Sequence, residues 1–147
     1  MKTVHHFEDV VATKNFAEKL GQKLKGGEMI ELISDIGGGK TTFVTGLAKG
    51  AGSKDKVSSP TFTISNLYQT PNFNIHHFDF YRLQDPGIIR HELEENIDDA
   101  SDVVVVEWSN IVEDVLPEKR VVIHIKATGE ESREISVSAP EELDYLA

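Results

Sequence analysis

Apolar positions along this chain follow two spacings, one typical of helices and one typical of strands. Apolar residues three and four positions apart predict helices, and short continuous or alternating apolar runs predict strands. The predicted helices cover 9–24, 43–48, 88–97 and 109–116. The predicted strands cover 29–33, 75–83, 103–106, 120–126 and 133–137, and a loop that becomes a strand covers 58–68. Strands that alternate with helices in this way predict an α/β fold.

Two of these segments carry further information about the sheet. The four valines at 103–106 form an unbroken β-branched run, which is typical of a strand buried on both faces of a parallel sheet. The strands at 120–126 and 133–137 are joined by a turn at 128–130 and predict a C-terminal hairpin. We expect one domain over residues 1–147, because no repeat or linker divides the chain, and an acidic tail from Glu141 onward that is mobile at its end.

A glycine-rich segment lies between the strand at 29–33 and the helix at 43–48. It matches the P-loop pattern G-x-x-x-x-G-K-[ST], except that Ser34 replaces the first glycine. Successive glycines let backbone N–H groups turn toward an anion, and the following helix directs its positive end at the same point. The predicted nucleotide-binding residues are Asp35, Ile36, Gly37, Gly38, Gly39, Lys40, Thr41 and Thr42. The alternative is an ordinary glycine turn followed by a solvated lysine.

Within this segment the side chains of Lys40, Thr41 and Thr42 have expected tasks. Lys40 would reach the β- and γ-phosphates of a nucleotide, and the Thr41 hydroxyl would complete the shell of a bridging Mg²⁺. Thr42 is placed to contact the α-phosphate. Ser34 adds a β-carbon at the entry to the loop, which affects loop geometry and affinity for nucleotide.

The strand at 75–83 contains a second candidate, Asp79. Side chains alternate across a strand, so Asp79 shares a face with His77, while His76 faces the other way. A carboxylate between Phe78 and Phe80 is costly to bury without a partner, so we favour an active-site acid over a buried hydrogen-bond anchor. Zinc binding by the two histidines and Asp79 is disfavoured, because adjacent residues on a strand point to opposite faces.

Glu107 follows the valine run directly. Four apolar residues and then an acid form a Walker B pattern, whose carboxylate reaches Mg²⁺ directly or through water. The alternative is a strand that emerges into solvent at Glu107. Trp108 is expected to pack at the edge of the core, and Ser109 to cap the next helix.

The roles of four other residues stay open on the sequence alone. Ser59 or Thr61 would bring a hydroxyl toward the metal and γ-phosphate, or they belong to an ordinary turn that starts a strand. Thr13 lies near a bound base or simply caps its helix. Arg133 lies over the nucleotide or on the surface.

Composition limits the possible partners. The chain has 147 residues, a net charge of −10 and no cysteine, so thiolate metal sites and disulfides are excluded. An acidic surface repels nucleic acid, so we expect no direct nucleic-acid binding. The chain lacks the long apolar segment of a signal peptide or a membrane span, and we expect a cytoplasmic protein.

Together the motifs resemble a known family. The P-loop, the S-P-T-F-T sequence at 59–63, the H-F-D-F-Y-R-L sequence at 77–83 and the V-E-W sequence at 106–108 resemble the TsaE (YjeE) family. These are P-loop ATPases of bacterial tRNA threonylcarbamoyladenosine biosynthesis. The resemblance covers nearly the whole chain, with the motifs in order and at fitting intervals.

The resemblance implies a P-loop NTPase-like three-layer fold with a mainly parallel sheet, and ATP with Mg²⁺ as ligands. It implies TsaD and TsaB as protein partners, which install a threonylcarbamoyl group on adenosine 37 of tRNAs reading codons that begin with A. Lys40 and Thr41 would hold phosphate and magnesium, Glu107 would be the second magnesium ligand, and Asp79 would be the essential acid. Arg133 matches a late arginine near the nucleotide.

Two other functions use the same motifs. A small-molecule kinase generally needs several arginines to clamp a second anionic substrate, and the four here are not clustered in the sequence: Arg82, Arg90, Arg120 and Arg133. A nucleotide-dependent binding switch with little turnover of its own differs from an ATPase mainly in rate. No Asn-Lys-x-Asp element for guanine occurs, which favours adenine.

Overall fold

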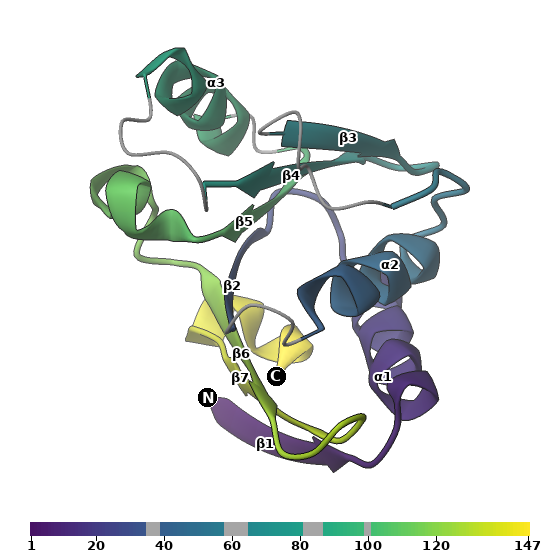
Figure 1. Ribbon diagram of the computed structural model, residues 1–147. Coiled ribbons are helices and arrows are strands. Elements are labelled where there is room, and N and C mark those ends of the chain that lie inside the picture. The colour runs from purple at the N-terminus through teal and green to yellow at the C-terminus, as the bar shows by residue number, and fades with distance from the viewer. Residues whose placement is uncertain (35–38, 58–64, 81–86, 99–100) are drawn as a thin grey trace.

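The computed structural model describes residues 1–34, 39–57, 65–80, 87–98 and 101–147, and their centre is a seven-stranded sheet (Figure 1). The described strands are β1 (Lys2–Phe7), β2 (Met29–Ser34), β3 (Ser65–Gln69), β4 (Asn74–Asp79), β5 (Val103–Glu107), β6 (Val121–Ala127) and β7 (Arg133–Ser138). The described helices are α1 (Val10–Gln22), α2 (Lys40–Gly50) and α3 (Gly87–Asp98), with short 3-10 helices η1 (Ser109–Val115) and η2 (Glu141–Leu146).

The strand order β1-β7-β6-β2-β5-β4-β3 places four parallel strands in the middle of the sheet. Strand β2 pairs in parallel with β5 and β6, and β5 pairs in parallel with β4. Antiparallel pairs close both sides, β4 with β3 on one and β6-β7-β1 on the other. The predicted α/β fold and C-terminal hairpin are therefore confirmed.

Strand β1 was not predicted from the sequence. Its exposure alternates residue by residue, but polar side chains occupy much of both faces, so the apolar pattern is weak. Its place in the sheet comes from the ladder with β7, in which Lys2 is opposite Ser138 and Phe7 is opposite Arg133. Such pairing between distant parts of the chain leaves no local signal.

Helices cover the two faces of the sheet and bury a separate core on each. Helices α1 and α2 lie on one face, and α3 and η1 lie on the other, over β4 and β5 (Figure 1). Val103 and Val105 belong to the first core, and Val104 and Val106 belong to the second. The prediction that the valine run is buried on both faces is confirmed.

The position of α2 is fixed by its close contact with α1. A β-carbon at Gly50 would lie 2.0 Å from the Glu18 carbonyl oxygen, and one at Gly21 would lie 2.1 Å from the Leu47 carbonyl oxygen. The two helices therefore approach more closely than side chains at these positions would allow. At its own start, α1 is capped by Asp9, whose carboxylate accepts a hydrogen bond from the Ala12 N–H at 2.7 Å.

The acidic tail packs on the protein, and the prediction of a mobile tail is wrong. Leu146 is 1% exposed and belongs to the core beneath α1 and α2. The Tyr145 hydroxyl donates a hydrogen bond to the Glu28 carboxylate at 2.7 Å, and the Lys25 amine lies 4.2 Å from the centre of the Tyr145 ring. The acidic residues hide the apolar signal, because only Leu143, Tyr145 and Leu146 interrupt them.

Replacing Tyr145 with phenylalanine should therefore destabilise the protein. It removes the hydrogen bond to Glu28 and keeps the ring, so we expect the free energy of unfolding to fall by about 1–2 kcal/mol at pH 7. Burial, and then the hydrogen bond to Glu28, raises the pKa of Tyr145 above its ordinary value. A tyrosine whose pKa is raised in the folded state adds to the free energy of unfolding as long as its hydroxyl is protonated. This contribution is complete below about pH 10, where the unfolded tyrosine is still neutral, and it is lost as the pH rises further.

Urea denaturation of both proteins at several pH values checks this. The difference between wild type and variant should be largest at neutral pH and should shrink above about pH 10. Equal stability at neutral pH would show that the tail hydrogen bond contributes nothing.

Candidate functional site

The predicted acids meet at the carboxyl edge of the four parallel strands. Asp79 ends β4 and Glu107 ends β5, and the two residues are direct neighbours in the parallel register. Leu32 of β2 is the neighbour of Glu107 on the other side. Neighbouring residues in parallel register point to the same face, so both carboxylates lie on the face that α2 covers. Ligands of open α/β sheets bind at this edge.

Helix α2 begins at the same edge, a few residues beyond the end of β2. Gly39 precedes it with a φ of 97°, in the left-handed region that favours glycine, and the first helical bond joins the Phe43 N–H to the Gly39 carbonyl. No described side chain caps the N–H groups at this end. The first turn therefore presents a positive helix end, and amides that no described side chain caps, to the carboxyl edge of the sheet.

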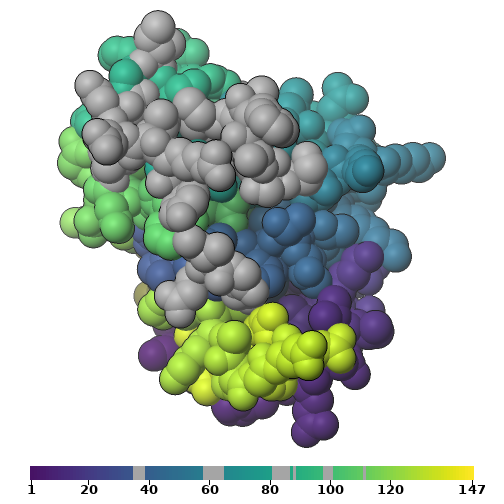
Figure 2. Space-filling model, in the orientation of Figure 1, coloured from purple at the N-terminus to yellow at the C-terminus, as the bar shows by residue number. Residues whose placement is uncertain are grey.

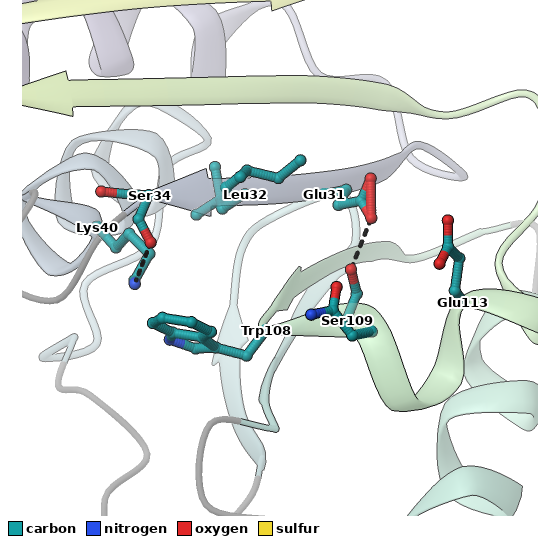
Figure 3. A pocket seen from close by; sticks show the side chains of 9 residues that line it. Glu31, Leu32, Ser34, Lys40, Trp108, Ser109 and Glu113 are labelled. Carbon is teal, nitrogen blue, oxygen red and sulfur yellow. Dashed lines mark hydrogen bonds between the residues drawn. The ribbon is translucent and has the colours of Figure 1, made fainter.

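Lys40, the first residue of α2, lies against Trp108. Its amine donates a hydrogen bond to the Ser34 carbonyl at 3.3 Å and lies 4.5 Å from the centre of the indole (Figure 3). Trp108 takes a left-handed backbone conformation with φ 54° directly after β5. It also packs against the second core, as predicted, but its contact with Lys40 was not foreseen. Neither contact neutralises the lysine charge.

A cavity of about 210 Å³ extends from Lys40 along the sheet (Figure 3). Its lining residues are Glu31, Leu32, Ile33, Ser34, Lys40, Trp108, Ser109, Asn110 and Glu113. Glu31 is buried in its wall, where the Ser109 hydroxyl donates to it at 2.6 Å and the Arg120 Nε donates at 3.4 Å. The prediction that Ser109 caps the following helix is therefore wrong: Trp108 occupies the cap position, and the Ser109 hydroxyl binds Glu31.

Glu107 is enclosed by the protein and does not emerge into solvent. It is 3% exposed, and its Oε2 lies 2.8 Å from His77 Nε2. His77 Nδ1 lies 3.1 Å from the Tyr68 hydroxyl. His76 points to the opposite face and binds Asp102 at 2.8 Å, and the described residues contain no cluster of three side chains able to hold a metal ion. The prediction that His76 and His77 face opposite sides of the strand is confirmed.

Asp79 is half-buried, and its carboxylate does not lie between the rings of its sequence neighbours Phe78 and Phe80. Phe78 and Phe80 stack with ring centres 6.1 Å apart in the core on the opposite face. The predicted alternation of the strand is confirmed, but the cost of burying Asp79 between two rings does not arise. Its case as a functional acid depends on its place next to Glu107.

Arg133 begins β7 at the same edge, since β7 runs back from the end of β6. Its Nη1 donates to the carbonyls of Gly129, Glu130 and Ser132, which holds the side chain against the hairpin turn. Together with Gly39 and Thr42 it lines a small hollow, and the hairpin lies beside the start of α2 (Figure 2). The arginine is thus close to the predicted nucleotide-binding residues.

Other predicted positions are placed as follows. Thr13 also lines that hollow, but it is buried and its hydroxyl donates to the Asp9 carbonyl at 3.3 Å, as a helix residue does. Thr41 is exposed in the first turn of α2. The predictions for Asp35, Ile36, Gly37, Gly38, Ser59 and Thr61 lie outside the described residues. In the described part of the chain, no helix is both long and apolar enough to cross a bilayer.

The fold is that of an α/β protein with a mixed sheet. Its candidate site lies at the carboxyl edge of the sheet, where the parallel strands end and helix α2 begins. The chain belongs to the TsaE family: the family model for the threonylcarbamoyl adenosine biosynthesis protein TsaE matches residues 7–135. The resemblance seen in the sequence is thereby confirmed.

Individual relatives agree with the family assignment. The chain is 34% identical to the tRNA threonylcarbamoyladenosine biosynthesis protein TsaE of Rickettsia typhi, over 91% of this chain and 93% of the relative. It is 37% identical to the protein of the same name from Bacillus subtilis, over 86% of this chain and 79% of the relative. The crystal structure of YdiB from Bacillus subtilis superposes with a TM-score of 0.80 at 30% identity, covering 99% of this chain and 91% of that one.

Proposed function

We propose that this protein binds ATP with Mg²⁺ at the carboxyl edge of its sheet and hydrolyses it in support of tRNA threonylcarbamoyladenosine biosynthesis. The observation that carries the proposal is the meeting of three groups at the carboxyl edge of the sheet. The start of α2 with Lys40, which no described side chain caps, suits phosphate, and Asp79 and Glu107 end neighbouring strands at the same edge. An anion site beside two acids is what a metal-bound triphosphate requires.

The residues at this edge fit a magnesium ion. Mg²⁺ prefers oxygen ligands and keeps several waters, so it needs only one or two groups from the protein. The Thr41 hydroxyl in the first turn of α2 and the Glu107 carboxylate supply oxygen of the right kind. Bound there with ATP, Mg²⁺ would offset negative charge on the phosphate oxygens.

Each side chain at the site has a separate role in ATP binding or hydrolysis. Lys40 exchanges the Ser34 carbonyl and the Trp108 ring for β- and γ-phosphate oxygens, which are stronger partners because they carry charge. Thr42 contacts the α-phosphate from the next position of α2. Asp79 orients the attacking water or accepts its proton, and Arg133 lies over the nucleotide from the hairpin side.

The chain acts through protein partners in this proposal, namely TsaD and TsaB. Its net charge of −10 disfavours direct contact with tRNA. A kinase function is disfavoured by the arginines that the structure describes. Arg90 binds Glu94 and Asp114, and Arg120 binds Glu31, so neither is available to clamp a second anionic substrate at the site.

The decisive experiment measures phosphate release from ATP by the isolated protein and after addition of TsaD and TsaB. We expect slow release alone and faster release in the complex, together with magnesium-dependent ATP binding by calorimetry. Transfer of the γ-phosphate to a metabolite would favour a kinase, and tight binding with no turnover in the complex would favour a switch. A protein that takes up no ATP in the presence of magnesium would contradict the proposal.

A further inference from the structure

A buried row of polar side chains leads from β3 through β4 to the Glu107 carboxylate. The Tyr68 hydroxyl lies 3.1 Å from His77 Nδ1, and His77 Nε2 lies 2.8 Å from Glu107 Oε2. Tyr68 is 2% exposed, His77 is 1% exposed and Glu107 is 3% exposed. These hydrogen bonds are therefore shielded from water. His77 is hydrogen-bonded through both of its ring nitrogens.

The hydrogen-bonding groups of this row match one another. An ionised carboxylate can only accept hydrogen bonds, so His77 Nε2 carries the proton that faces Glu107. The Tyr68 hydroxyl can donate or accept, and it hydrogen-bonds His77 Nδ1 on the other side of the ring. Tyr68 thereby fixes the orientation of the imidazole ring.

The two buried acids of the described strands, Glu31 and Glu107, have different partners. Glu31 is paired with the guanidinium of Arg120 and the Ser109 hydroxyl, which offsets its negative charge inside the fold. Glu107 is held by the imidazole of His77 through Oε2. Within the described part of the chain, this bond leaves Oε1 for another partner. A carboxylate that a hydrogen bond on one oxygen orients is suited to bind a cation through the other.

We propose that His77 is a positioning residue for magnesium: it holds Glu107 in the orientation that binds the ion, and Tyr68 in turn holds His77. This inference rests on the proposed function, because it concerns the same metal-nucleotide site. It assigns a task to the first residue of the H-F-D-F-Y-R-L sequence, whose aspartate is the proposed acid.

The test uses His77→Leu, His77→Gln and Tyr68→Phe. Leucine removes the donor and fills the site, whereas the amide of glutamine can still donate toward Oε2. Calorimetry measures ATP binding across a range of magnesium concentrations and again in excess chelator. We expect His77→Leu to raise the magnesium concentration for half-maximal ATP binding by about 10- to 100-fold. His77→Gln should recover most of that loss, and Tyr68→Phe should raise the requirement a few-fold.

Two controls separate positioning from general damage. ATP binding in chelator should be the same in all variants, because the contacts of Lys40 and the helix end do not involve His77. His76→Leu is the matched control, since His76 lies next in sequence, faces the opposite side and binds Asp102 at the far end of β5. Its magnesium requirement should equal that of the wild type.

The possible outcomes separate this inference from the proposed function. A wild type that binds no ATP overturns both. A wild type that binds magnesium and ATP, beside a folded His77→Leu variant with the same magnesium requirement, overturns the role of His77 alone. If His77→Leu does not fold, Tyr68→Phe decides, and an unchanged magnesium requirement in that variant overturns the proposal.

Discussion

Replacing Lys40 with alanine should lower the proposed ATP hydrolysis, measured with TsaD and TsaB as the proposed partners, by roughly 100- to 1000-fold. The amine is the first charged side chain of α2 and lies at the edge where Asp79 and Glu107 end their strands. Removing it takes away a fixed positive charge from the position where charge develops on the phosphates. Binding of ATP should weaken in the same variant, because the amine contacts the ground state as well.

The fold should survive this substitution. Among the described residues, Lys40 makes one hydrogen bond to a carbonyl and one contact with the Trp108 ring, which together stabilise the protein by only about 1 kcal/mol. Lys49→Ala is the matched control, because Lys49 lies on the same helix and its amine pairs with Glu18 at the surface. A Lys40→Ala protein that hydrolyses ATP as fast as the control would remove Lys40 from the mechanism.

Much of the fold follows from local patterns in the sequence. The run Val103–Glu107 predicts a doubly buried strand because all four valines are apolar and β-branched, and each face of β5 indeed meets its own core. The glycine-rich segment predicts a helix that starts after β2, and Gly39 and Lys40 stand at that start. These features are formed by residues close together in the sequence, so the local sequence pattern predicts them.

The features that the sequence did not reveal depend on contacts between distant residues. His77 and Glu107 are thirty positions apart, and their bond exists because β4 and β5 pair in parallel. The Tyr145–Glu28 bond joins residues 117 positions apart and fixes a tail whose composition suggests mobility. The contact of Trp108 with Lys40 depends on a left-handed residue after β5, which the tryptophan itself does not suggest.

Replacing Asp79 with asparagine should lower hydrolysis by about 100-fold or more while leaving the affinity for magnesium and ATP within a few-fold of the wild type. Asparagine has nearly the same shape but cannot take a proton from water. Asp79 is the register neighbour of Glu107, so its charge repels both that carboxylate and the phosphates. Removing the charge therefore costs little in binding, and the loss should appear in turnover.

Asp102→Asn provides the matched control, because Asp102 precedes β5 at the opposite edge of the sheet. Its carboxylate accepts from the Asn74 N–H and from His76, so that variant should lose stability and keep its rate. Asp79→Ala then separates the two roles left open for Asp79. Asparagine keeps one acceptor oxygen, so a rate well above that of alanine indicates that Asp79 orients water through a hydrogen bond. Equally low rates of the two variants indicate that it accepts the proton, and an Asp79→Ala protein with normal turnover would exclude both roles.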